Sequence, residues 1–193
     1  MRSKQDIQTQ IPSLRITSGS AKNKKLTVPE VPGIRAVQEI TKLAIFSILG
    51  EKVLNAACLD LYAGSGNMGL EALSRGANWC DFIDNNWNAK QAIEKNIKFC
   101  GFEEKAETHL SEAVKFVANT ENKYDVVFCD PFYDDLNHKF LIKNMGEVLN
   151  TDGYIFFLHS DKLNMENLLT ETSLVMESQR KYGKTLLSIL RLK

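Results

Sequence analysis

A glycine-rich segment is the first part of the sequence whose residue types and spacing could do chemistry. It runs Asp-Leu-Tyr-Ala-Gly-Ser-Gly-Asn-Met-Gly from Asp60 to Gly69, within and after an apolar run typical of a buried strand. Glycine permits a tight turn and lets a bound molecule approach the backbone without a Cβ in the way. Asp84 ends the next apolar run, where its carboxylate could accept hydrogen bonds from ribose hydroxyls. The segment therefore predicts a nucleoside-type cofactor, and by itself it fits NAD as well as S-adenosylmethionine.

A second segment, Asp130-Pro131-Phe132-Tyr133, favours S-adenosylmethionine because a nicotinamide enzyme has no evident use for it. The exocyclic amine of a nucleic-acid base is a poor nucleophile, since its lone pair is conjugated with the ring. A carboxylate and a neighbouring carbonyl that accept its two N–H bonds would help this lone pair to point at an electrophilic methyl group. Proline would hold the loop in place, and an aromatic side chain could stack on the extracted base. The segment predicts methylation of a base amino group.

Both segments must be positioned by a sheet, and the chain from residue 57 onward alternates strand-like and helix-like patterns. This alternation with short loops predicts an α/β fold with a doubly wound, mostly parallel, seven-stranded sheet. Runs on both sides of Gly183 predict a closing antiparallel hairpin, because the connection is too short for a crossover. Ligands of such sheets bind at the carboxyl ends of the strands, so both segments are expected on one rim. The predicted parallel strands cover residues 57–62, 79–84, 107–110, 124–130 and 154–159.

The sequence divides into three predicted parts. Residues 1–13 are polar and predict a flexible tail. Residues 14–50 predict a small extension, with a β-hairpin that turns at Asn23 and a helix that ends at Gly50. Residues 51–193 predict the cofactor-binding domain. Within the extension, the expected strands are 14–18 and 25–29, and the expected helix is 37–49.

Composition limits the classes of protein that the chain can represent. Its 193 residues are 44% hydrophobic and 25% charged, as in soluble globular domains. No apolar run approaches the roughly 18 residues of a membrane span, and the N-terminus lacks the apolar core of a signal peptide, so a cytoplasmic protein is expected. Four cysteines without a CxxC pair and three scattered histidines predict no metal site.

Positive charge is concentrated near both ends of the chain. Basic side chains outnumber acidic ones nine to four in residues 1–52 and five to one from Glu177 onward, although the net charge is zero. This distribution suggests an anionic partner that touches the termini, and the alternative is a solvated surface of uneven charge. The candidates for phosphate contacts are Arg15, Lys22, Lys24, Lys25, Arg35 and Lys184.

The chain resembles the RsmD-like family, bacterial methyltransferases that act on a guanine N2 of small-subunit (16S) ribosomal RNA. The resemblance runs from about Leu14 to the C-terminus and is closest in LDLYAGSGNMGLEALSRGA at 59–77. LRITSGSAKNKKL at 14–26 is similar to the family's N-terminal hairpin, and KYGKTLLSILR at 181–191 to its final strands.

This resemblance implies a Rossmann-like class I methyltransferase that uses S-adenosylmethionine without a metal, on ribosomal RNA or an assembling small subunit. It implies that residues 130–133 form the catalytic loop and that Glu112 lies near the adenine. A monomer is expected from the small size and neutral charge. The implied cofactor-binding residues are Asp60, Tyr62, Ala63, Gly64, Ser65, Gly66, Asp84, Asn85, Glu112 and Ala113.

Two departures from the family pattern keep alternatives open. Phe132 replaces the second proline of an Asp-Pro-Pro-aromatic loop, which removes a fixed φ and restores an N–H. Arg35-Ala36-Val37 stands where the family has an Arg-Pro-Thr-type segment. The alternatives are a catalytically weakened RNA-binding or ribosome-assembly factor and an N6-adenine methyltransferase. A protein-glutamine methyltransferase is disfavoured, because it usually has Asn at the position of Asp130, and a dehydrogenase is the least favoured.

Overall fold

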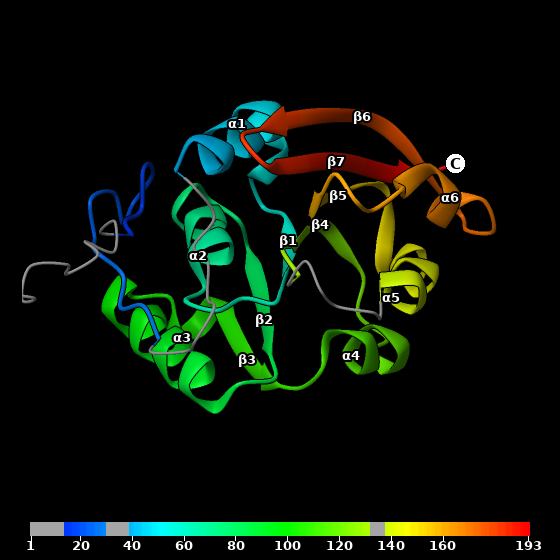
Figure 1. Ribbon diagram of the computed structural model, residues 1–193. Coiled ribbons are helices and arrows are strands. Elements are labelled where there is room, and N and C mark those ends of the chain that lie inside the picture. Colours follow the sequence, from blue (N-terminus) through cyan, green and yellow to red (C-terminus); the bar gives the residue numbers. More distant parts are fainter. Residues whose placement is uncertain (1–13, 30–38, 132–137) are drawn as a thin grey trace, which may run out of the picture.

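The computed structural model describes residues 14–29, 39–131 and 138–193 and is built around one seven-stranded sheet (Figure 1). The strand order is β3-β2-β1-β4-β5-β7-β6. The five strands β3, β2, β1, β4 and β5 pair in parallel, whereas β7 pairs antiparallel with β5 and β6. The predicted doubly wound sheet with a closing antiparallel hairpin is confirmed. The strands are β1 Ala57–Leu61, β2 Trp79–Asp84, β3 Ala106–Leu110, β4 Tyr124–Cys129, β5 Leu149–Ser160, β6 Leu174–Tyr182 and β7 Thr185–Leu192.

Helices cover both faces of this sheet and enclose two apolar clusters. One cluster takes side chains from α1, α2 and α3, and the other takes them from α4, α5 and α6. Strand β1 serves both, because successive side chains alternate: Cys58 belongs to the first cluster and Leu59 to the second. The helices are α1 Glu39–Leu49, α2 Asn67–Ser74, α3 Trp87–Cys100, α4 Ala113–Asn119, α5 His138–Met145 and α6 Met165–Leu169. Short 3-10 turns span Gly50–Val53, Glu103–Lys105 and Gly146–Val148.

The register of the central strands determines which residues share an edge. Leu61 at the end of β1 pairs with Ile83 of β2 and with Cys129 of β4. The residues that follow these pairs, Tyr62, Asp84 and Asp130, therefore emerge at the same carboxyl edge. This arrangement is the predicted rim.

Local sequence signals account for the bounds of α3. The Asn86 side chain accepts hydrogen bonds from the backbone N–H groups of Asn88 and Ala89, which caps the first turn. Gly101 ends the helix in the left-handed conformation, with φ of 79°. Both ends of α3 are therefore explained by residues at the helix termini themselves.

The N-terminal hairpin has shorter strands than predicted. Its turn contains Asn23 at φ of 70°, as expected, but the pairing is a single antiparallel bridge between Arg15 and Lys25. The flanking backbone groups bond elsewhere: Thr17 donates to Glu71 of α2, and Thr27 donates to Asn96 of α3. Contacts with the helices therefore replace the hydrogen bonds of a longer ladder.

Other element bounds differ from the prediction in detail. Strand β5 begins at Leu149 instead of residue 154, and its pairing with β4 shifts register between Tyr124 and Val126. Residues 151–153 lie in this irregular part of the strand. The predicted tail 1–13 lies outside the described residues. None of the helices in the described ranges has the length and apolar character that a membrane span requires.

Candidate active site

Three residues of the turn after β1 have positive φ angles. Tyr62, Gly64 and Gly66 have φ of 60°, 57° and 76°, and the chain then enters α2 at Asn67. A Cβ placed on Gly64 would meet nothing closer than the Tyr62 carbonyl oxygen at 3.9 Å. The space in front of Gly64 is therefore open, as a bound ligand requires. The left-handed Tyr62 has a strained conformation of the kind that clusters at functional sites.

Gly69 has a different reason to be glycine. A Cβ there would lie 2.4 Å from Cε1 of Phe82 and 2.5 Å from Sγ of Cys80, both on β2. The first turn of α2 therefore packs directly against the neighbouring strand. The Asp60 carboxylate accepts the backbone N–H of Gly69 at 2.8 Å, which fixes the start of the helix to β1.

Asp84 organises the rim from the end of β2. Its Oδ2 accepts the backbone N–H of Gly64 at 2.9 Å, and its Oδ1 accepts that of Asn86 at 2.9 Å. Burial raises the pKa of Asp84, and these hydrogen bonds oppose the rise. Each carboxylate oxygen retains capacity for a further hydrogen bond, so ribose hydroxyls could still be accepted.

Three carboxylates meet at this edge of the sheet. Burial raises the pKa of Asp60 to about 8, with the Gly69 hydrogen bond opposing and the nearby Asp130 and Asp84 adding to the rise. With a pKa of about 8, Asp60 holds a proton at neutral pH, so the negative charge of the rim comes from its neighbours Asp84 and Asp130. Such a site favours a cationic ligand.

Glu112 and Ala113 follow the carboxyl end of β3, which pairs with the end of β2 at Asp84. The backbone N–H of Ser111 donates to the Asp84 carbonyl oxygen at 3.0 Å, which ties this loop to β2. Glu112 precedes α4 and is exposed, and its carboxylate pairs with Lys115 at 2.7 Å. Ala113 is buried, and Asn85 is exposed beside Asp84.

Part of the predicted catalytic loop is described. Asp130 follows β4 and is half-buried, and Pro131 is buried. Phe132 and Tyr133 lie outside the described residues. Asp130 is thus brought to the glycine turn and Asp84 from a separate strand.

The candidate phosphate contacts differ in their surroundings. Lys22, Lys25 and Lys184 are exposed. Arg15 pairs with Glu39 of α1 at 3.0 Å. Lys24 donates to the Phe99 carbonyl oxygen at 2.7 Å and lies over the Phe99 ring. Arg35 lies outside the described residues.

Two buried polar side chains near the turn were not predicted from the sequence. Lys42 of α1 and Asn96 of α3 are each about 1% exposed. Lys42 carried a signal, because it lies four residues before Phe46 and seven before Leu49, on the apolar face of its helix. Asn96 carried no such signal, since a single asparagine among the many polar residues of a helix is common.

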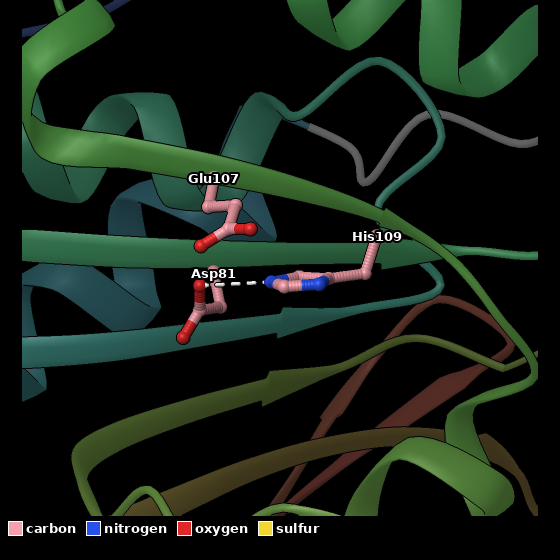
Figure 2. A group of neighbouring side chains, drawn as sticks. All are labelled: Asp81, Glu107 and His109. Carbon is pink, nitrogen blue, oxygen red and sulfur yellow. Dashed lines mark hydrogen bonds and ion pairs between the residues drawn. The ribbon is translucent and has the colours of Figure 1, made fainter.

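A group of possible metal ligands lies away from the rim. Figure 2 shows Asp81 of β2 beside Glu107 and His109 of β3, with ligand atoms within 4.8 Å of one another. Asp81 Oδ1 pairs with His109 Nε2 at 3.1 Å, and its Oδ2 accepts the Tyr124 hydroxyl at 2.7 Å. Burial and this bond to Asp81 raise the pKa of Tyr124. These two partners explain how Asp81 is tolerated in the interior, and the expected absence of a metal stays a prediction.

A hollow of about 660 Å³ lies at the opposite edge of the sheet. Its lining includes Asn55 and Ala56 before β1 and Asp125 at the start of β4. Charged groups in it already pair: Lys52 with the Tyr154 hydroxyl, and Arg191 with Glu177 at 3.2 Å. It is separate from the carboxylate rim.

Comparisons with known proteins agree with this geometry. A family model described as "Conserved hypothetical protein 95" matches residues 14–191. A Bacillus subtilis protein named "Putative rRNA methyltransferase YlbH" is 31% identical over 183 residues, covering 92% of this chain and 98% of that protein. The "Ribosomal RNA small subunit methyltransferase D" of Escherichia coli is 35% identical over 118 residues, covering 61% of this chain and 59% of that protein. A solved Escherichia coli structure, "Putative methyltransferase yhhF", has a TM-score of 0.81 at 24% identity, covering 94% of this chain and 98% of that one.

The fold, the carboxylate rim and these similarities together define a methyltransferase of the Rossmann-like class. The similarity to the solved structure shows the fold, and the sequence relatives show the methyltransferase activity. The chain belongs to the family described as "Conserved hypothetical protein 95". The resemblance to RsmD-like methyltransferases is thereby confirmed.

Proposed function

We propose that this protein transfers a methyl group from S-adenosylmethionine to N2 of a guanine in small-subunit ribosomal RNA. One observation carries the proposal: Asp130 emerges on the same sheet edge as the glycine turn and Asp84, from the strand next to β1. A carboxylate that can accept an amine thus lies beside a site suited to a nucleoside. Relatives named as ribosomal RNA methyltransferases support RNA as the substrate.

The rim fits S-adenosylmethionine in shape and charge. The open space at Gly64 can take the ligand close to the backbone, and Asp84 can accept from the ribose hydroxyls. The Asp84 and Asp130 carboxylates beside the turn suit a positively charged sulfonium. When bound, this cofactor supplies an electrophilic methyl group. We assign its binding to the turn residues Asp60, Tyr62, Ala63, Gly64, Ser65 and Gly66, to Asp84 and Asn85 at the ribose, and to Glu112 and Ala113 at the adenine.

The reacting amine is held by the loop after β4 in this proposal. The Asp130 carboxylate and the Pro131 carbonyl oxygen accept the two N–H bonds of guanine N2. Tyr133 packs on the face of the extracted base, and Phe132 is tolerated in place of a second proline. Positioning supplies most of the acceleration, because the methyl donor is already strongly electrophilic. The proton that leaves the product amine passes to Asp130 or to water.

RNA contacts are assigned to the basic side chains at the two ends of the chain. Lys22 and Lys25 are exposed on the N-terminal hairpin, and Lys184 is exposed in the β6–β7 turn. They can neutralise phosphates without specifying sequence. Arg15, Lys24 and Arg35 complete the assigned set. A monomer in the cytoplasm and the division at residues 13 and 50 remain predictions.

The test is transfer of labelled methyl from S-adenosylmethionine to 16S ribosomal RNA and to partly assembled small subunits, followed by nucleoside analysis. Label in N2-methylguanine is the expected result. Label in N6-methyladenine would replace the proposed base with adenine. No transfer, with cofactor binding confirmed in parallel, would instead favour an RNA-binding assembly factor that has lost catalysis.

A further inference from the structure

Two buried side chains each bond to both the N-terminal segment 14–29 and the glycine turn. The first is Lys42 of α1. Its Nζ donates to the Arg15 carbonyl oxygen at 2.6 Å and to Oδ1 of Asn67 at 2.8 Å. Asn67 directly follows Gly66, so Lys42 joins one strand of the hairpin to the exit of the turn.

The second connector is Asn96 of α3. Its Nδ2 donates to the carbonyl oxygens of Thr27 and Ser65, both at 2.9 Å, and its Oδ1 accepts the Thr27 N–H at 2.8 Å. Both amide hydrogens are used, and none is left for water. Asn96 therefore joins the other strand of the hairpin to the residue that precedes Gly66 in the turn.

Glu71 of α2 fixes the same segment to the helix behind the turn. It pairs with Lys42 at 3.1 Å, and it accepts from the Thr17 backbone and hydroxyl and from the Ser18 backbone. Burial raises the pKa of Glu71, but the Lys42 charge and the hydrogen bonds from Thr17 and Arg75 outweigh it and hold that pKa below its usual range. The segment thus cannot slide along α2 without breaking buried polar contacts.

The glycine turn, to which Lys42 and Asn96 both bond, is the part of the rim that the proposed cofactor would contact. Ser65 and Asn67 flank Gly66, whose backbone is left-handed with φ of 76°. Any shift of these two residues on ligand binding must be shared by Lys42 and Asn96, because leaving their buried partners unpaired is energetically costly. The movement then reaches Arg15 and Thr27 through those side chains.

We propose that Lys42 and Asn96 are positioning residues that couple cofactor binding at the glycine turn to the conformation of the basic N-terminal segment 14–29. The identity of the two ligands, S-adenosylmethionine and RNA, rests on the proposed function. The coupling is reciprocal by linkage: whatever factor the cofactor adds to RNA affinity, RNA adds to cofactor affinity. Neither residue need touch either ligand.

The first experiment uses the full chain without RNA and measures amide hydrogen exchange with and without S-adenosylhomocysteine. In the wild type, ligand is expected to slow exchange both in the glycine turn and in residues 14–29. In Asn96→Ala and in Lys42→Met, protection of the turn persists and protection of 14–29 falls at least severalfold. Gln91→Ala removes an exposed amide from the same helix as Asn96 and is expected to behave as wild type.

The second experiment measures the Kd of S-adenosylhomocysteine with and without saturating 16S ribosomal RNA. The ratio is expected to be about 5- to 20-fold in wild type and in Gln91→Ala, within the usual range of coupling between sites. It is expected to approach one in Asn96→Ala. A merely structural role would lower stability or both affinities and leave this ratio unchanged.

The outcomes separate the coupling from the proposed function. Absence of ligand protection at 14–29 in the wild type overturns the coupling, and this result needs no variant that folds. Full protection at 14–29 in both variants, checked for folding by thermal unfolding, overturns the role of Lys42 and Asn96. If exchange shows the coupling but no RNA is bound or methylated, the proposed function fails and the coupling stands.

Discussion

The Asp84 carboxylate accepts the backbone N–H of Gly64 at 2.9 Å, so the end of β2 holds the turn that follows β1. One side chain thus shapes the turn and faces the place assigned to a ribose. Because β1 and β2 pair in parallel with Leu61 opposite Ile83, the end of β2 lies beside the turn that follows β1. This relationship makes Asp84 the first residue to test for cofactor binding.

Asp84→Asn is expected to weaken S-adenosylhomocysteine binding about 10- to 100-fold. An amide has one oxygen and cannot accept at both positions, and hydrogen bonds to a charged acceptor are worth about 1.5–3 kcal/mol. Isothermal titration calorimetry measures the loss. Glu94→Gln, which neutralises an exposed carboxylate on α3, is the matched control. Unchanged affinity in Asp84→Asn would remove this residue from the cofactor site.

Asp130→Asn is expected to lower methyl transfer about 10²- to 10³-fold, as the loss of one preorganised acceptor does in other enzymes. The amide keeps the size of the side chain but lacks the charge that favours the developing cationic nitrogen. Cofactor affinity should change less than fivefold. Single-turnover transfer to 16S ribosomal RNA, with calorimetry in parallel, checks both. Full turnover with intact cofactor binding would show that Asp130 does not orient the amine.

Asp60 should make stability depend on pH. Its pKa is raised to about 8 in the folded protein, against an ordinary value of 3.8, so the folded state holds a proton that the unfolded chain has lost. The contribution of this group is present below about pH 4 and is lost as pH rises towards about 8, by at most about 1.4 kcal/mol per pH unit. Urea unfolding between pH 5 and 9 should show this loss in wild type. Asp60→Asn should flatten it, and an identical slope in both proteins would contradict the assignment.

The exposed hairpin lysines should control the salt dependence of RNA binding. Lys22→Ala and Lys25→Ala are each expected to reduce the slope of log K against log salt by about one, with little change in sequence preference. Filter binding over a range of salt concentrations measures this slope. Lys143→Ala, at an exposed position of α5 on the opposite face of the sheet from the hairpin, should leave it unchanged. Equal slopes in all variants would remove the hairpin from the RNA interface.

Gly69→Ala is expected to destabilise the fold by about 1–3 kcal/mol, the usual cost of overpacking. The added methyl would lie 2.4 Å from the Phe82 ring and 2.5 Å from the Cys80 sulfur. Urea unfolding measures the change. Adding Phe82→Leu should recover part of the loss, because it removes the ring edge that the methyl meets. A Gly69→Ala protein as stable as wild type would show that α2 can retreat from β2.

The sequence by itself determined the order of elements and the rim. Apolar runs broken by glycine, asparagine and proline placed β1, β2 and β4 closely, and the signals at Asn86 and Gly101 placed both ends of α3. These features are local, because strand periodicity, capping and turn geometry depend on a few neighbouring residues. Parallel pairing then brings the ends of successive strands together, so the meeting of Asp84 with the glycine turn could be predicted.

Only the tertiary structure decided which polar side chains lie in the interior and what they join. Lys42 is separated from its partners Arg15 and Asn67 by 27 and 25 positions, and Asn96 is separated from Thr27 by 69. The same holds for Asp81, which is brought to His109 and Tyr124 by strand register. A buried lysine or asparagine is stable only where distant backbone groups complete its hydrogen bonds, and composition and periodicity contain no record of those distances.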